Sequence, residues 1–236
     1  MRFSKFFCFI TLNLVLIGCE NNDASNQQSL ASVDHIIDAK IFLEINKTLQ
    51  EGNDFIDLNN KSITDLSDLI ILQDIESIYL RDNYIEDLKP LGKLSNLKDL
   101  RLGNNYITDL APLSNLQKLT RLCIEENRVT DLLPLKKMHG LKELRAWENR
   151  ITDLEPIANL KNLKELYLSQ NKIKDISVLS GLINLKKLSL WGNNLTDITP
   201  LTKLTNLVEL ELSHNDIPEE EKVLLEEVLP NTKISW

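Results

Sequence analysis

Large aromatic and guanidinium side chains recur at fixed positions in this sequence, and their chemistry is that of recognition. Tyr, Trp and Arg are enriched where proteins bind one another, because they offer large rigid surfaces or forked hydrogen-bond donors. Every tyrosine, every arginine after Arg2 and every tryptophan except Trp236 falls in a few columns of a 22-residue repeat. We therefore predict a partner-binding face that includes Tyr79, Arg81, Tyr84, Arg101, Tyr106, Arg121, Arg145, Trp147, Tyr167 and Trp191.

Two sub-sites are expected within this face. Trp147 and Trp191 share a column two repeats apart, with Tyr167 between them, and we expect one aromatic cluster. Beside it, arginines and glutamates alternate as a mosaic that suits a folded protein partner better than a polyanion. The mosaic comprises Arg121, Arg128, Arg145, Arg150, Glu125, Glu126, Glu143, Glu148 and Glu165. The alternative is that such residues merely suit an exposed strand surface.

Residue types associated with catalysis and metal binding occur without the spacing that either needs. The three histidines have no ligand spacing, and we find no nucleophile–base pair, phosphate loop or metal cluster. We expect a protein that is not an enzyme and that holds no cofactor and no metal. A column of aspartates could suggest a calcium ladder, but each repeat supplies only one carboxylate side chain. Each of these aspartates begins an Asp-Leu-x-Pro-Leu pattern or an equivalent one, which is typical of a helix start. The column is Asp65, Asp87, Asp109, Asp131, Asp153, Asp175 and Asp197.

The cysteines indicate no disulfide within the mature chain. Cys8 lies in an apolar N-terminal run and Cys19 follows it, which leaves Cys123 alone in the repeats. Cys123 occupies a column of the binding face, so we expect it to be exposed. The protein is expected to be a monomer, with a dimer linked through Cys123 as the alternative.

The N-terminus predicts a secreted and lipidated protein. Arg2 and Lys5 precede a short apolar segment, which indicates a signal peptide over residues 1–18 that is too short to span a bilayer. The four residues Leu16-Ile17-Gly18-Cys19 resemble a bacterial lipobox, which implies lipidation of Cys19. Polar residues then predict a flexible tether over 19–32, reaching about 20 Å. We expect a lipid-anchored protein of the bacterial cell envelope, at the outer membrane or cell surface.

Eight repeats position these side chains. Over residues 53–217, the pattern Leu-x-x-Leu-x-Leu-x-x-Asn recurs every 22 residues without insertion or deletion, which predicts a solenoid of short parallel strands. The asparagine column lies where the chain leaves each strand, and we expect its amides to bond backbone groups in the turn and in the next repeat. Apolar residues at i+4 predict a helical N-terminal cap over 33–52. Pro218 predicts a C-terminal cap over 218–236, comprising a helix through Val228 and a final strand.

The repeat resembles the leucine-rich repeats of bacterial internalins, a type shared with a eukaryotic phosphatase-regulator subclass. This resemblance covers residues 53 to about 217. It implies an α/β solenoid, curved and right-handed, with a parallel sheet on the concave face, short 3₁₀ turns outside, and protein recognition through the concave side chains. The sequence shows no cell-wall anchoring motif and no immunoglobulin-like domain after the repeats.

The sequence therefore predicts a membrane-anchored protein-recognition module. A net charge of −8 argues against nucleic acid or an anionic bilayer face as the partner, so membrane contact is expected through the lipid alone. One alternative is an adhesin that contacts host or neighbouring cells. Another is glycan binding on a platform of Trp147, Tyr167 and Trp191.

Overall fold

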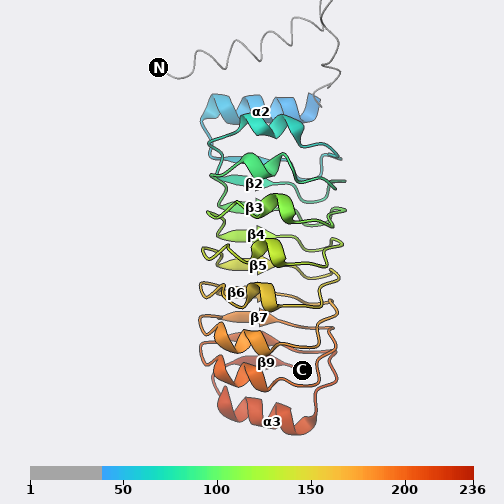
Figure 1. Ribbon diagram of the computed structural model, residues 1–236, viewed down its shortest axis with the longest axis vertical. Coiled ribbons are helices and arrows are strands. Elements are labelled where there is room, and N and C mark those ends of the chain that lie inside the picture. The colour runs from blue at the N-terminus through green and yellow to red at the C-terminus, as the bar shows by residue number, and fades with distance from the viewer. Residues whose placement is uncertain (1–38) are drawn as a thin grey trace, which may run out of the picture. The chain divides into compact units, whose positions relative to one another are not determined.

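The computed structural model describes residues 39–236, which form one stack of similar layers (Figure 1). The predicted signal peptide, Cys19, the tether and the first residues of the predicted N-terminal cap lie outside the described residues.

A single parallel sheet runs through the stack. Within the described part of the chain the sheet has nine strands, which lie side by side in sequence order. From β1 to β8, each residue pairs with the residue 22 positions later, on the next strand. The strands are β1 (Phe55–Asp57), β2 (Ser77–Tyr79), β3 (Asp99–Arg101), β4 (Arg121–Cys123), β5 (Glu143–Arg145), β6 (Glu165–Tyr167), β7 (Lys187–Ser189), β8 (Glu209–Glu211) and β9 (Lys233–Ser235). The first eight are one per repeat, as predicted, and β9 is the predicted final strand.

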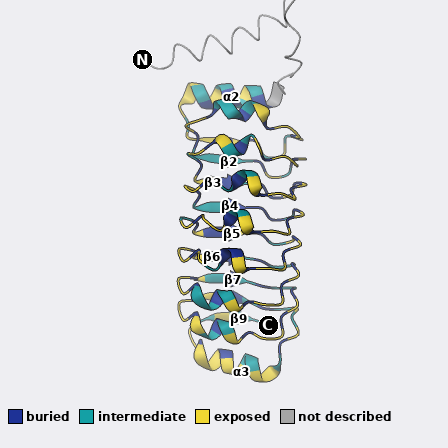
Figure 2. Ribbon diagram, viewed as in Figure 1, coloured by how far each residue is buried: buried dark blue, intermediate teal, exposed yellow. Residues whose placement is uncertain are grey.

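Short 3₁₀ segments form the opposite side of the stack. They are Ser67–Ile71, Leu91–Lys93, Ala111–Leu113, Leu133–Leu135, Glu155–Ile157, Ser177–Gly181 and Thr199–Lys203. The leucine and isoleucine columns fill the space between these segments and the sheet as one continuous core, in which most side chains have no accessible surface. Figure 2 shows buried residues along the layers and exposed ones at their outer turns. The predicted solenoid, with a parallel sheet on one face and 3₁₀ turns on the other, is confirmed.

The asparagine column forms a buried ladder. The Asn127 amide group donates to the carbonyl oxygens of Ile124 and Glu125 at 3.1 and 3.0 Å, and to that of Leu102 at 2.9 Å. Its Oδ1 accepts the backbone N–H of Ile107 at 2.9 Å. Leu102 and Ile107 belong to the preceding repeat, so the ladder is confirmed, but each amide reaches backward along the chain instead of forward. The same pattern recurs at Asn83, Asn105, Asn149, Asn171, Asn193 and Asn215.

The aspartate column has a structural role. Each carboxylate accepts the backbone N–H two residues later, at 2.7–2.9 Å, as when Asp109 accepts from Ala111. The N-cap of the segment Ala111–Leu113 is Leu110, so Asp109 stands one position before the observed N-cap instead of being the N-cap itself, as predicted. These bonds hold the turn that leads into each segment, and at Asp175 they lower the carboxyl pKa.

One column of the repeat adopts a left-handed backbone just after the strand, and the first repeat has a second such residue at Ser62. This column includes Glu126, Glu148 and Gln170, with φ of 54°, 52° and 51°, and Gly192. Only glycine takes this conformation at little cost, so the other side chains are held there by the surrounding ladder. Sequence reasoning did not identify this column, because its residue types vary from repeat to repeat.

Helices close both ends of the stack. At the N-terminal end, α2 (Ala39–Glu51) packs Ile41 and Ile45 onto the first repeat and contacts β1. At the other end, α3 (Glu219–Val228) follows Pro218 and buries Leu225. Both predicted caps are confirmed over the described residues. Because the caps cover the open ends of the core, the surfaces left for binding are the sheet face, the 3₁₀ side and the two edges.

Candidate partner-binding surface

The sheet face consists of the side chains that alternate with the buried leucines. The first residues of β3, β4 and β5 are Asp99, Arg121 and Glu143, which lie side by side in one row. The third residues of β2 to β6 form the neighbouring row, Tyr79, Arg101, Cys123, Arg145 and Tyr167. Strands in a sheet are about 4.8 Å apart, so each side chain touches its neighbours in the row.

Charged residues on β3, β4 and β5 form a continuous line of ion pairs, which we call the guanidinium platform: Arg101, Asp99, Arg121, Glu143 and Arg145. Arg101 binds Asp99 through two bonds, from Nε at 3.2 Å and from Nη2 at 2.9 Å. Arg121 lies between the two acids and donates to Asp99 at 2.7 Å and to Glu143 at 2.6 Å. Arg145 donates from Nε to the other Glu143 oxygen at 2.6 Å.

The platform is layered, with acids below and guanidinium groups above. The side chains of Asp99 and Glu143 are 13% and 11% exposed, whereas those of the three arginines are 41–46% exposed. Burial by itself would raise the pKa of Glu143, but hydrogen bonds from Arg121 and Arg145 outweigh it and lower the pKa. The bonds to Glu143 and Asp99 raise the pKa of Arg121. The groups offered to a partner are therefore cationic, on a chain whose net charge is −8.

Tyrosines flank the platform on both sides. The Arg101 guanidinium lies 4.3 Å from the centre of the Tyr79 ring, and that of Arg145 lies 5.2 Å from the Tyr167 ring. Tyr167 also donates to Glu165 at 2.8 Å. Each outer guanidinium is thus held by a carboxylate and by a ring face, which restricts its rotamers. Flat cationic groups and aromatic rings in fixed positions suit the binding of a protein surface.

Arg81 lies beyond the platform and covers a second buried acid. Its Nη2 is 3.1 Å from Glu126, and its Nη1 is 4.0 Å from Glu125. The Glu125 side chain is 7% exposed, and its Oε2 has no hydrogen-bond partner within the described residues. Burial raises the pKa of this carboxyl group. A Cβ on Gly103 would come within 2.6 Å of Glu125, so the glycine provides the space that this side chain occupies.

The predicted aromatic cluster does not form. Trp191 contacts His214, with ring centres 5.4 Å apart and an Nε1–Nδ1 hydrogen bond of 2.8 Å. Within residues 39–236, no ring contact joins Trp147, Tyr167 and Trp191. Ser169 stands between the two tryptophans in their column and bonds Ser189 instead. The prediction of one cluster was therefore wrong, and the platform expected for stacking a sugar is not assembled.

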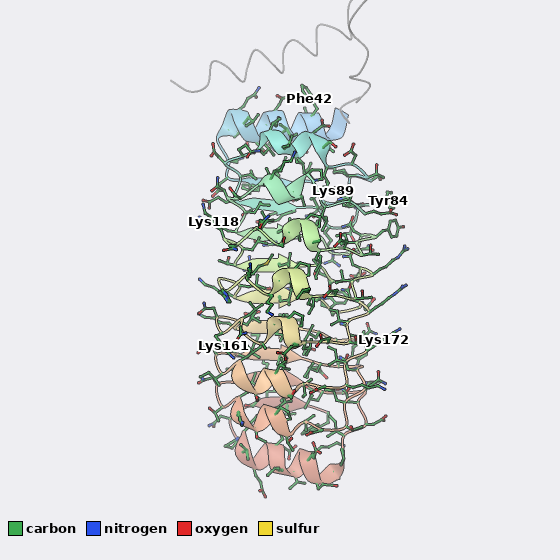
Figure 3. All side chains as sticks on the ribbon, viewed as in Figure 1. Phe42, Tyr84, Lys89, Lys118, Lys161 and Lys172 are labelled. Atoms are coloured by element: carbon green, nitrogen blue, oxygen red, sulfur yellow. The ribbon has the colours of Figure 1, made fainter. Side chains whose placement is uncertain are left out.

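Tyr84 and Tyr106 lie at an edge of the stack, apart from the guanidinium platform. Their rings stack at 6.0 Å, and the Arg128 guanidinium lies 4.7 Å from the Tyr106 ring centre. Figure 3 shows Tyr84 pointing outward at the same edge as Lys172. The structure thus divides the predicted residues into two separate surfaces.

Cys123 is buried, which corrects the prediction that it is exposed. Only 4% of the residue is accessible, because its short side chain lies between the long side chains of Arg101 and Arg145 in the same row. Burial, followed by the charge of Glu125, raises the thiol pKa to about 12. A disulfide between two copies would require this part of the sheet face to open.

We expect the Cys123 thiol to be unreactive in the folded protein. In a chain carrying Cys8→Ser and Cys19→Ser, Ellman's reagent at pH 8 should modify Cys123 at least a hundredfold more slowly in buffer than in urea. The reason is that the thiolate is the nucleophile, and a raised pKa leaves little of it. Similar rates in buffer and in urea would show that the thiol is accessible in the native state.

A shallow hollow adjoins the platform on the C-terminal side. It has a volume of about 240 Å³ and is lined by residues of β6 to β9. Leu188 and Leu210 form its floor, and Tyr167, Lys187 and Lys233 stand around it. An apolar floor with a charged rim would suit a side chain of a bound protein.

The charge network of the platform was missed in the sequence, although a signal for it was present. The mosaic grouped Glu143 with Arg121 and Arg145 but left out Asp99. Asp99 lies one repeat before Arg121 and Glu143 one repeat after it. This 22-residue spacing places the two acids on the strands on either side of Arg121. The sequence pattern contains no information on which member of each pair is buried.

The described residues contain neither a membrane-spanning helix nor a metal-binding group of side chains. Over residues 39–236, no helix has the length and apolar character needed to cross a membrane. In the same range, no group of three or more His, Cys, Asp or Glu side chains is placed to hold a metal ion.

Comparisons with known proteins agree with this architecture. A family model for leucine-rich repeats, in two copies, matches residues 73–115, 95–137, 139–181 and 183–221. The chain is 30% identical to an internalin C2 of Listeria monocytogenes, with a TM-score of 0.75, and the match covers 78% of this chain and 81% of that one. No curated protein matches the sequence.

Two further solved structures are similar over part of their length. An internalin F of Listeria monocytogenes is 35% identical, with a TM-score of 0.70, and 73% of this chain covers 51% of it. The leucine-rich-repeat ectodomain of a plant membrane receptor kinase from Arabidopsis thaliana, solved in complex with Casparian strip integrity factor 2, is 28% identical with a TM-score of 0.57. That match covers 64% of this chain and 20% of the ectodomain.

Proposed function

Because this chain belongs to the leucine-rich-repeat family, a typical scaffold for protein–protein interaction, we propose that it binds a protein partner through its sheet face. The guanidinium platform is the observation that carries this proposal. The plant ectodomain was solved with a bound factor, which supports a binding role for a repeat array of this kind. The similarity to internalins supports the same general role.

The platform has the properties of a preformed binding site. Among the described residues, Arg121 bonds through Nε and Nη1 and Arg145 through Nε alone, so donors remain available for a partner. Because these side chains are already ordered by buried acids and by ring faces, binding would cost less side-chain entropy than it would for free arginines. Carboxylate or carbonyl oxygens on the partner are the groups that this surface would accept.

Site-specific photo-crosslinking tests which face contacts the partner. Benzoylphenylalanine in place of Tyr167, on the sheet face, should give a discrete crosslinked protein in intact cells. The same residue in place of Leu133, which is 57% exposed on the 3₁₀ side, should give none. Crosslinks from Leu133 alone would place the partner on the opposite side of the stack and contradict the proposal.

We also propose that a lipid on Cys19 holds the protein in the bacterial cell envelope, at the outer membrane or cell surface. The support is the sequence alone: a short apolar segment followed by Leu16-Ile17-Gly18-Cys19. More than one acyl chain on this cysteine would give a stable anchor. The Cys19→Ala chain is expected to move from the membrane fraction to the soluble fraction and to lose labelling by an alkyne fatty acid. Continued labelling of this variant would exclude Cys19 as the lipid site.

A further inference from the structure

A second charged surface lies at the edge of the stack, outside the sheet face. It is a column of five exposed residues that we call the edge strip: Tyr84, Tyr106, Arg128, Arg150 and Lys172. Each backbone N–H in the column donates to a carbonyl of the preceding repeat at 2.8–3.0 Å, as Arg128 does to Ile107. The column is therefore regular, with rungs at about the 4.8 Å spacing of strands.

The edge strip differs from the sheet face in its charge pairing. On the sheet face, Arg81, Arg101, Arg121 and Arg145 all form ion pairs. Within residues 39–236, no carboxylate lies within 4.0 Å of the cationic groups of Arg128, Arg150 or Lys172. Among the described residues, the Arg128 guanidinium contacts the Tyr106 ring alone.

Arg128, Arg150 and Lys172 lie on successive repeats and repel one another. Neighbouring residues in the sequence do little to reduce this repulsion. The exposed Glu148 is two residues before Arg150, but it is beyond ion-pair distance, and Lys174 adds a further cation beside Lys172. The chain as a whole is acidic, so this concentration of unpaired positive charge does not follow from its composition. An anionic ligand would relieve the repulsion.

We infer that the edge strip binds an acidic helical segment of a protein partner. On a helix, carboxylates three or four residues apart advance about 4.5–6 Å along the axis, which matches the spacing of the rungs. The stacked pair of Tyr84 and Tyr106 continues the column and offers an apolar surface at one end. Apolar residues of the same helix would pack there, while its acidic face lies along Arg128, Arg150 and Lys172.

This inference rests on the proposed role in protein recognition, but it uses a separate set of residues. The probe is a fluorescein-labelled, alanine-based helical peptide with glutamates at i, i+4 positions along one face, and its counterpart has glutamine at those positions. Fluorescence polarisation at low salt should show binding of the glutamate peptide and at least tenfold weaker binding of the glutamine peptide. Added salt should weaken the first interaction because the cations are exposed.

Variants then assign the binding to the edge strip. The triple variant Arg128→Gln, Arg150→Gln and Lys172→Gln is expected to bind the glutamate peptide roughly tenfold more weakly, the effect of three exposed ion pairs. The matched control, Lys118→Gln, Lys161→Gln and Lys203→Gln, removes the same charge elsewhere and should bind as the native protein does. Figure 3 shows Lys118 and Lys161 at the edge opposite Lys172.

Three outcomes would overturn the inference. They are equal affinity for the two peptides, an equal loss in the control variant, and failure of the glutamate peptide to bind while heparin or polyphosphate binds the edge strip. The proposed function fails separately, when crosslinks from the Tyr167 position are absent although the peptide still binds. Conversely, the triple variant could bind the glutamate peptide as the native protein does while the Tyr167 position still crosslinks. That result would reject the edge strip alone.

Discussion

Replacing Arg101 and Arg145 with alanine is expected to weaken binding of the sheet-face partner by roughly a hundredfold, or about 2.8 kcal/mol. These two guanidinium groups are the outer cations of the platform, and each is held between a carboxylate and a tyrosine ring. Their removal takes away forked donors that are already ordered. Biolayer interferometry with the protein recovered by crosslinking would measure the change.

Two matched variants make this result specific. Arg101→Lys with Arg145→Lys keeps both charges but loses the planar fork, so we expect it to recover less than half of the lost binding energy. Lys118→Gln with Lys161→Gln, at the far edge, should leave the affinity unchanged. Because Arg121 still bridges Asp99 and Glu143, the alanine variant should retain its circular dichroism spectrum. A folded alanine variant with native affinity would show that the platform does not contact the partner.

Asn127→Ala is expected to lower the free energy of unfolding by about 4 kcal/mol, because it leaves buried backbone groups without partners. The Asn127 side chain makes four hydrogen bonds, to three carbonyl groups and to the N–H of Ile107. Alanine replaces none of them, and Asn127 is 8% exposed, so little water can reach the groups left without partners. Urea denaturation followed by circular dichroism would give the value.

The control is the same substitution where the amide is exposed. Asn162 donates one bond, to the carbonyl of His139 at 2.7 Å on the surface, so Asn162→Ala should cost no more than about 1 kcal/mol. Equal losses at the two positions would mean that the buried ladder contributes no more than a surface hydrogen bond.

The fold could be predicted from the sequence because each column has one physical demand. The leucines at the strand positions have to be buried, and the asparagine that follows has to satisfy a turn, so a 22-residue period fixes both. The direction of the asparagine bonds could not be predicted, since either neighbouring repeat offers carbonyl groups. Asn127 reaches Leu102 and Ile107 because the turn of the preceding repeat lies against it.

The binding surfaces were predicted in part. Column positions place Arg101 and Arg145 on the sheet face, but they do not determine how long side chains fold over shorter ones. Cys123 is buried for that reason, by neighbours in its own row. Trp191 turns to His214 in the next repeat, a contact that depends on rotamers. Tyr84 and Tyr106, each directly after an asparagine of the ladder, lie at the edge of the stack and apart from Tyr79.

The backward reach of the asparagine ladder gives the stack a direction that matters during synthesis. Asn83 completes the turn of the first repeat, where Lys61 stands in place of the asparagine, and each later asparagine completes the turn before its own. A repeat that has just left the ribosome therefore keeps unsatisfied backbone groups until the next one follows. The last of these turns is finished by Asn215, directly before the C-terminal cap. Translation that stops inside the array would leave the last turn of the truncated chain without the asparagine bonds that the next repeat supplies.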